Sequence, residues 1–170
     1  YALTIEPQTP FGALHRKGKL PLAKEDVVAE TFDRLRDALG QAGFQHYEVS
    51  NHAIEGETSK HNQHYWRGGA YVGLGAGAVG AMDEGARVRR TKNTIDPKRY
   101  MDAGGIEEEE VIEGDELIQE GLMLGLRTAE GVDLRALEAR AGMPWSTGRE
   151  AAIERRREAG DLVLENDRLK

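Results

Sequence analysis

The 170-residue sequence contains no cysteine. Disulfide bonds, thiolate zinc sites and thiol catalysis are therefore excluded, and no thiolate-held iron–sulfur cluster can form within these residues. The sequence also lacks an excess of positive charge, because 23 Lys and Arg stand against 30 Asp and Glu, for a net charge of −7. This balance argues against general binding to nucleic acid or to an anionic membrane.

Long apolar stretches are absent as well. A membrane-spanning helix needs about 20 apolar residues, whereas the uncharged stretch 70–82 is short and rich in glycine. No basic and apolar leader opens the sequence, so nothing indicates secretion. We therefore expect a cytoplasmic protein with no membrane span and no nucleic-acid partner, while peripheral membrane contact stays open. Because the first residues read as a strand without a lead-in and the last stop within a hairpin, we expect a fragment of a longer chain.

Residues 1–105 have the pattern of an α/β sheet covered by helices. Residues 1–5 form a short β-prone run, and the prolines and glycines of residues 7–21 indicate irregular structure. Apolar residues at helical spacing predict a helix over 24–39, and residues 44–50 predict a strand. Strand, helix and strand in this order are typical of a parallel sheet. Further elements are expected as strands at 70–74 and 87–92 and as a short helix at 96–103.

Residues 106–170 are expected to form a second, mainly helical domain, itself truncated. Residues 107–110 are four glutamates, which we interpret as a solvated stretch. Three helices and a hairpin at Asn166 and Asp167 follow. Helices followed by a hairpin in this order are typical of a winged-helix module. The residues that we expect to cap these helices are Asp115, Asp133 and Thr147.

A winged-helix order raises the question of DNA binding, with Arg155, Arg156 and Arg157 as recognition residues. From Gly114 onward, however, 9 basic residues face 12 acidic ones, and glutamates share the helix of these arginines. A phosphate backbone would be repelled by much of this surface. We therefore interpret the module as a docking or lid domain.

The most informative stretch is HNQHYWRGGAYVGLGAGAVG, residues 61–80. Together with the segment before it, this stretch gathers four of the five histidines within 19 residues. Neutral imidazole is a ligand for metals and haem, but loop histidines bonded to the backbone would give the same pattern. No HExxH-like spacing is present, and a tetrahedral zinc site would need further ligands. The clustered histidines are His46, His52, His61 and His64.

The glycines of this stretch match a dinucleotide fingerprint, Gly75-x-Gly77-x-x-Gly80. That motif must open a long helix, and the residues after Gly80 do not continue as one, so we reject this interpretation. Backbone without side chains at Gly73, Gly75 and Gly77 does permit close approach of a flat ligand.

Polar residues that follow the predicted strands are further candidates. In parallel barrels the active site lies at the carboxyl ends of the strands. Glu6, Ser50 and Asn51 occupy such positions. Bonds to local turn amides would explain Glu6 and Asn51 equally well.

In order along the chain, YALTIEPQTPFG, LPLAKEDVVAE, GFQHYEVSNHA, HNQHYWRGGAYVGLGAGA, RTKNTIDPKRY and LMLGLRTAEGVDL resemble the oxygen-independent coproporphyrinogen-III-oxidase-like proteins. Within this radical S-adenosylmethionine family the sequence is most similar to the HemW branch. HNxxYW, residues 61–66, is the most specific element. The resemblance covers nearly the whole chain.

The resemblance implies the C-terminal part of a partial (β/α) radical-SAM barrel over 1–105, followed by a small winged-helix-like domain over 106–170. The family binds a [4Fe–4S] cluster and S-adenosylmethionine. The HemW branch is implied to bind haem and deliver it to haem-accepting proteins, with His61 as the axial ligand to the haem iron. Tyr65 and Trp66 would then lie against the porphyrin plane, and Arg67 is our own inference for a propionate partner.

Some residues depart from the family pattern. The cysteine motif of the family is missing, so we expect these residues alone to hold no cluster and to be inactive as an enzyme. The loop that usually reads GIGPGAH has Ala76 in place of proline and Val79 in place of histidine. His52 stands where phenylalanine is common. We predict a haem chaperone; the alternative is an oxygen-independent coproporphyrinogen III oxidase that uses the cluster and S-adenosylmethionine.

Overall fold

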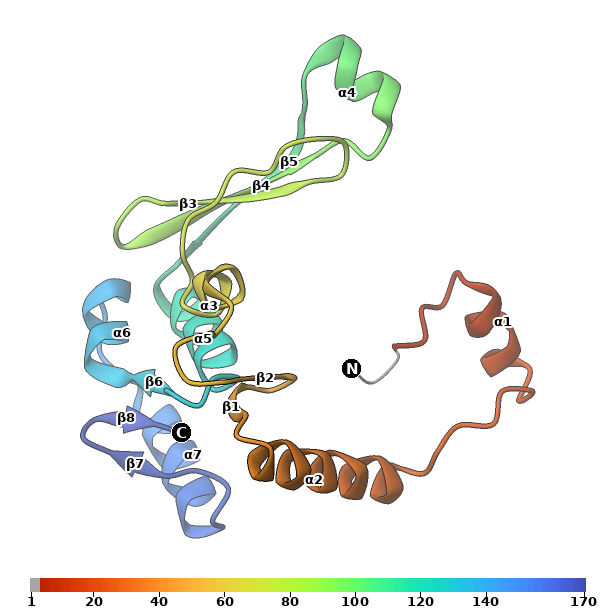
Figure 1. Cartoon of the computed structure of the whole chain (residues 1–170). Coiled ribbons are helices and arrows are strands. Elements are labelled where there is room, and N and C mark those ends of the chain that lie inside the picture. The colour runs from red at the N-terminus through yellow and green to blue at the C-terminus, as the bar shows by residue number, and fades with distance from the viewer. Residues whose placement is uncertain (1–3) are drawn as a thin grey trace. The chain divides into compact units, whose positions relative to one another are not determined.

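The computed structural model describes residues 4–170 and divides the chain into two compact units. The first unit contains residues up to His46 together with Ser50–Glu57, and the second contains Tyr47–Val49 together with Thr58–Lys170. Helices and small sheets are both present (Figure 1). The mixed α/β class is therefore confirmed, whereas a place in a larger parallel barrel stays a prediction.

The described residues of the first unit form two helices, of which the sequence indicated one. Helix α2 spans Glu25–Gln41 and confirms the helix expected there. Helix α1, Pro10–Arg16, occupies a segment that we expected to be irregular. This expectation was wrong because Pro10 stands at the first helical position, where its missing N–H costs nothing, and the Thr9 side chain accepts a hydrogen bond from the Gly12 N–H at 3.1 Å.

Two short strands follow helix α2 in the sequence. Strands β1, Gln45–Glu48, and β2, Asn51–Ala53, form a two-stranded sheet, and β1 falls within the strand expected at 44–50. Of the strand expected at 1–5, residues 1–3 lie outside the described residues, and Thr4 and Ile5 belong to no strand.

The largest sheet lies in the second unit. Strands β3, Val79–Asp83, β4, Arg87–Asn93, and β5, Ile106–Glu113, pair antiparallel in this order. The three strands lie side by side in an elongated ribbon, with helix α4, Pro97–Ala103, beyond one end (Figure 1). Strand β4 and helix α4 confirm two predicted elements. The strand predicted at 70–74 does not form, since Tyr71 alone bridges Ala81.

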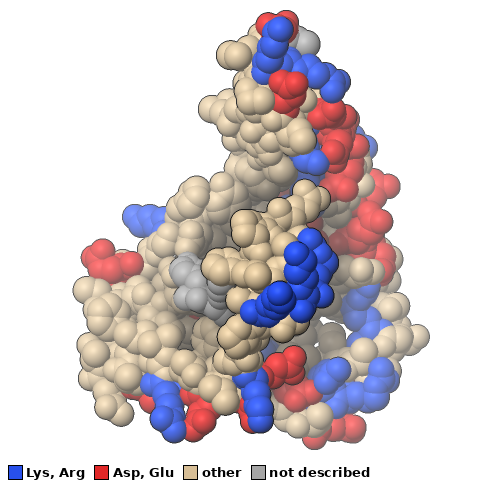
Figure 2. Space-filling model, turned by 90° about the vertical axis from the view of Figure 1, so that its right-hand side faces the viewer, with Lys and Arg blue, Asp and Glu red and all other residues tan. Residues whose placement is uncertain are grey.

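The glutamates 107–110 are exposed, as expected of a solvated stretch, and they form part of strand β5. Cations of the neighbouring strand β4 explain why four successive glutamates can lie in one strand. Arg89 pairs with Glu109 at 2.7 Å, and Lys92 pairs with Glu108 at 2.6 Å. Opposite charges on adjacent strands stabilise a sheet. Figure 2 shows acidic and basic side chains next to one another in the upper part of the view, where Figure 1 places this sheet.

The remaining residues of the second unit form helices and a small sheet. The hairpin turn at Asn166 and Asp167 is confirmed, with φ angles of 53° and 62° at these two residues, as a two-residue hairpin turn requires. The strands of this small sheet have the order β6-β8-β7 and pair antiparallel. The elements are α5 (Gly114–Gly125), β6 (Val132–Asp133), α6 (Leu134–Ala141), α7 (Thr147–Glu158), β7 (Leu164–Glu165) and β8 (Arg168–Leu169).

Of the three predicted helix caps, the structure confirms the one at Asp133. Asp133 caps α6 by accepting a hydrogen bond from the Ala136 N–H at 2.9 Å, as expected. The cap of α7 is Ser146, one residue before the predicted Thr147. Asp115 lies inside the first turn of α5, where its carboxylate bonds side chains and not the helix backbone.

The core of the second unit joins its sheet to its helices. Ile118 of α5 is fully buried and Leu117 is 2% exposed. Both pack in one cluster with residues of the large sheet and of the C-terminal elements, so α5 is the central element of this unit. The other buried members are Ala81, Val88, Ile112, Val132, Leu137 and Ala141. Among residues 4–170, no helix is long and apolar enough to cross a membrane.

Asp115 gives this unit a predicted pH dependence. Arg149 donates a hydrogen bond to its carboxylate at 2.6 Å, and Gln119 donates another at 2.7 Å. These two hydrogen bonds hold the pKa of the Asp115 carboxyl below its usual value, and the bond from Arg149 has the larger effect. A carboxyl group whose pKa is lower in the folded state stabilises the fold above its unfolded pKa and loses this effect as the pH falls.

We therefore expect the free energy of unfolding to decrease as the pH falls from about 5 to 2, and Asp115→Asn to make this decrease smaller. Denaturant unfolding of both proteins across this pH range measures the effect. The same pH dependence in both would contradict the assignment to Asp115.

Candidate functional site

The HNxxYW residues form a short helix, α3, Lys60–Trp66. The Ser59 side chain begins the helix by accepting a hydrogen bond from the Asn62 N–H at 3.2 Å. The helix ends at Arg67, and Gly68 then takes a φ of 65°, a conformation that favours glycine. Helix α3 packs against α5, so the central element of the unit supports it.

His61 is exposed on α3 and is held by an aromatic neighbour. Its ring lies 4.8 Å from the ring of Tyr65, centroid to centroid, at an interplanar angle of 86°. Tyr65 in turn makes an edge contact with Tyr71 at 4.7 Å. Within residues 4–170, no group hydrogen-bonds the ring nitrogens of His61. The two tyrosines therefore position an imidazole that is available as a ligand.

His64, three residues later, is used differently. One of its ring nitrogens, Nε2, lies 2.7 Å from the carbonyl oxygen of Ala70. Its ring also fills the space beside Gly69, where a Cβ would approach the imidazole to 2.3 Å. His64 therefore fixes the turn after α3, and its bonded nitrogen is engaged within the protein.

The four clustered histidines do not act as one set in either unit. His46 and His52 contact each other in the first unit, with ring centroids 4.7 Å apart. His61 and His64 belong to the second unit. No group of three or more His, Asp or Glu side chains in the described part of the chain has the geometry of a metal site. A metal site built from several of these side chains therefore does not form among the described residues.

Trp66 and Arg67 follow on the same segment, and each has a partner. The Arg127 guanidinium lies 4.9 Å from the centroid of the Trp66 ring. Arg67 forms an ion pair with Glu130 at 2.6 Å, and both side chains are more than half exposed. Arg67 is therefore neutralised by the protein, and a ligand carboxylate would have to displace Glu130.

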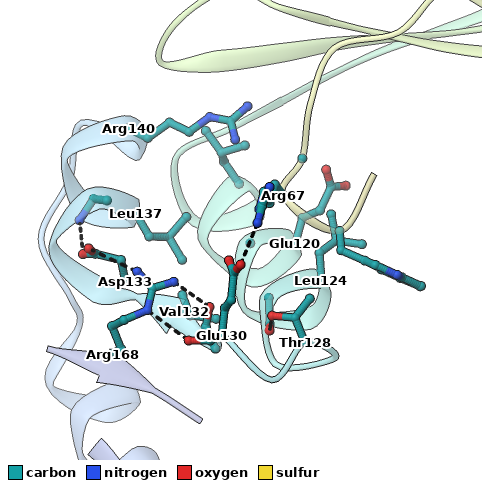
Figure 3. Close-up of a pocket in the computed structure, with 17 residues that line it drawn as sticks. Arg67, Glu120, Leu124, Thr128, Glu130, Val132, Asp133, Leu137, Arg140 and Arg168 are labelled. Carbon is teal, nitrogen blue, oxygen red and sulfur yellow. Dashed lines mark hydrogen bonds and ion pairs between the residues drawn. The ribbon is translucent and has the colours of Figure 1, made fainter. Parts of the chain in front are cut away.

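A cavity of about 210 Å³ lies beside this ion pair. Figure 3 shows the Arg67 and Glu130 side chains pointing toward each other at its edge. The Arg168 side chain donates hydrogen bonds to the carbonyl oxygens of Glu130 and Gly131, at 3.0 and 3.2 Å. Like that of Arg67, its guanidinium is therefore already bonded within the protein. Drug-sized ligands occupy roughly 300–1,000 Å³. The cavity is therefore too small for a ligand of the size of a porphyrin.

The glycines after α3 serve the fold of the chain itself. A Cβ at Gly73 would lie 2.5 Å from the carbonyl oxygen of Val79, so this glycine permits close approach of two backbone segments. Gly75 and Gly77 have φ angles of 101° and 72°. Strand β3 follows them, which confirms that the dinucleotide motif lacks its helix. A contact of these glycines with a ligand stays a prediction.

We expect Gly73→Ala to lower the free energy of unfolding by about 1–3 kcal/mol, because the added methyl group overpacks the backbone of Val79. Gly148→Ala is the matched control, since its Cβ would meet nothing within 4 Å and alanine favours the helix by about 1 kcal/mol. Denaturant unfolding compares the two variants. A Gly73→Ala protein as stable as the parent would show that the loop can move aside.

Glu6 belongs to the first unit and is exposed. Its backbone carbonyl accepts hydrogen bonds from the N–H and the hydroxyl of Thr9, at 3.2 and 2.7 Å. These bonds give Glu6 a local structural role, and a role in ligand binding stays a prediction.

Three residues of the site were not singled out from the sequence, namely Tyr71, Arg127 and Glu130. Tyr71 supports Tyr65, and the other two lie about 60 positions after α3 in the sequence. Arg127 and Glu130 belong to LMLGLRTAEGVDL, one of the segments that carry the family resemblance. This resemblance was the signal in the sequence that could have identified them. Their proximity to α3 follows from the packing of α3 on α5, which no local pattern reveals.

Comparison with known proteins agrees with the family resemblance. The HemN C-terminal domain family matches residues 112–170. A protein named Heme chaperone HemW from Lactococcus lactis is 38% identical over 141 residues, which cover 81% of this chain and 36% of the relative. Another with this name, from Escherichia coli, is 36% identical over 131 residues, 76% of this chain and 34% of the relative.

A mouse protein named Radical S-adenosyl methionine domain-containing protein 1, mitochondrial, is 37% identical over 141 residues, 78% of this chain and 32% of the relative. The chain thus spans about a third of the length of these curated relatives. No solved structure matches. These relatives confirm the resemblance to the HemW branch, and residues 112–170 belong to the HemN C-terminal domain family.

Proposed function

We propose that the protein binds haem through His61 and delivers it to acceptor proteins. The observation that carries this proposal is the exposed His61 imidazole, held by Tyr65 and Tyr71 and not hydrogen-bonded by any other described residue. Imidazole nitrogen is a strong axial ligand for haem iron. Exposure suits a chaperone, because its haem must leave for another protein. The relatives named Heme chaperone HemW support this role.

The larger architecture is part of the same proposal. Residues 1–105 would complete a radical-SAM barrel and residues 106–170 would form a winged-helix-like domain. The element order from α5 through β8, with a three-stranded sheet made of β6, β8 and β7, supports the second assignment. A [4Fe–4S] cluster and S-adenosylmethionine would be bound by the full polypeptide, in the cytoplasm. The cluster needs thiolates that these residues do not contain.

Haem transfer and porphyrin turnover distinguish this function from the oxidase alternative. The full polypeptide is loaded with ferric haem and mixed with apomyoglobin, while a second sample receives coproporphyrinogen III and S-adenosylmethionine under anaerobic conditions. We expect transfer of intact haem and no decarboxylated product. Decarboxylation without haem binding would contradict the chaperone function.

A further inference from the structure

A second cation near α3 differs from Arg67 in having no carboxylate partner. Arg127 lies two residues after the end of α5, is exposed, and makes no ion pair with any residue of the described part of the chain. Its guanidinium lies 4.9 Å from the centroid of the Trp66 ring. The contrast with Arg67 is direct, since Arg67 is held by Glu130 at 2.6 Å.

The backbone of Arg127 is fixed on both sides. Its N–H donates to the Leu124 carbonyl at 3.2 Å, and its own carbonyl accepts from the Val49 N–H at 2.8 Å. The aromatic face of Trp66 then limits where the guanidinium can lie, since arginine stacks on such faces. The charge is thus placed beside the last residue of α3 before any ligand arrives.

Trp66 adds a second unsatisfied polar group at this place. Its indole Nε1–H is buried and has no hydrogen-bond partner within the described residues. Indole can only donate a hydrogen bond, and a buried donor without a partner is costly. The Arg127 guanidinium over the Trp66 ring also has no carboxylate acceptor among the described residues, and it favours an anionic group with several acceptor atoms, such as a carboxylate.

We infer that Arg127, beside Trp66, is the residue that binds a propionate carboxylate of haem. This inference rests on the proposed function, in which His61 binds the iron. Trp66 lies five residues after His61, about 7.5 Å along the helix axis, on the segment that carries the α5 contact. The same five residues place Trp66 about 140° around the helix from His61, so a flexible propionate arm that passes the end of α3, and not the porphyrin ring, would reach Arg127. Arginine matches a carboxylate with two parallel hydrogen bonds.

The test compares haem with its dimethyl ester, in which both propionates are neutral. The parent protein, Arg127→Gln and Arg127→Lys are titrated with each compound, and Arg67→Gln serves as a neighbouring control. We expect Arg127→Gln to weaken haem binding about tenfold or more, which corresponds to the loss of one charged hydrogen bond. Arg127→Lys should recover part of the loss, and the ester should bind all four proteins alike.

Two outcomes would overturn the inference. Equal haem affinity of the parent and Arg127→Gln would show that no propionate uses this residue, and an equal loss for the ester would show a structural role. Thermal unfolding of the variant separates a folding defect from a binding defect. If the parent itself showed no His61-dependent haem spectrum, the proposed function would fail as well, which is a different result from a failure confined to Arg127.

Discussion

Ferric haem added to the His61→Ala variant will fail to give the Soret shift that the parent protein gives. The His61 imidazole is exposed and none of the described residues hydrogen-bonds its nitrogens, so its removal takes away the ligand and little of the fold. The position lies on a helix surface, where such a substitution changes stability by less than about 0.5 kcal/mol. Absorbance titration measures the loss, and far-ultraviolet circular dichroism checks that the helices remain.

His64→Ala is the matched control on the same helix. This substitution removes the 2.7 Å contact between His64 Nε2 and the Ala70 carbonyl oxygen. It also empties the space beside Gly69 that the imidazole ring fills. We expect a less stable protein that still gives the haem spectrum of the parent. The axial-ligand assignment would be contradicted if His64→Ala lost the spectrum and His61→Ala kept it.

Ile118→Ala will lower the free energy of unfolding by about 2–5 kcal/mol, the usual range for removing the side chain of a buried isoleucine. Ile118 is 0% exposed and packs in the cluster that joins the large sheet to the C-terminal helices. Because the surrounding elements cannot collapse fully into the space, the cost includes a cavity as well as lost apolar burial. For a domain of this size, such a loss is a large part of the total stability.

Met123→Ala tests whether this loss depends on burial. Met123 lies on the same helix, α5, but is 60% exposed. We expect its replacement to change stability by no more than about 0.5 kcal/mol. Denaturant unfolding of both variants provides the measurement. Similar losses at Ile118 and Met123 would contradict the central place of α5 in the core.

Local patterns predicted the elements that local interactions stabilise. Helix α2 follows from apolar residues at helical spacing, and the cap of α6 from Asp133. Strand β5 could not be recognised, since four glutamates become a strand only when the cations of β4 lie opposite them. Helix α1 was missed because Pro10 and Gly12 suggest a turn until Thr9 caps the segment.

In the candidate site, too, local patterns did not reveal the features that depend on contacts between distant segments. The resemblance in HNxxYW pointed to His61, but no local pattern predicted helix α3 or the different surroundings of His61 and His64. This distinction depends on the carbonyl of Ala70, which the turn after α3 brings to one imidazole only. The choice between Arg67 and Arg127 likewise depends on Glu130 and Trp66, whose contacts come from the packing of α3 against α5.

The most direct test of the central claim is a ferric haem titration of His61→Ala with and without free imidazole. A small ligand can replace the missing side chain only if the haem still binds at the same place. We predict that the variant alone gives no Soret shift of the parent type and that added imidazole restores it. A parent-like spectrum of His61→Ala without imidazole would contradict the claim that His61 is the axial ligand.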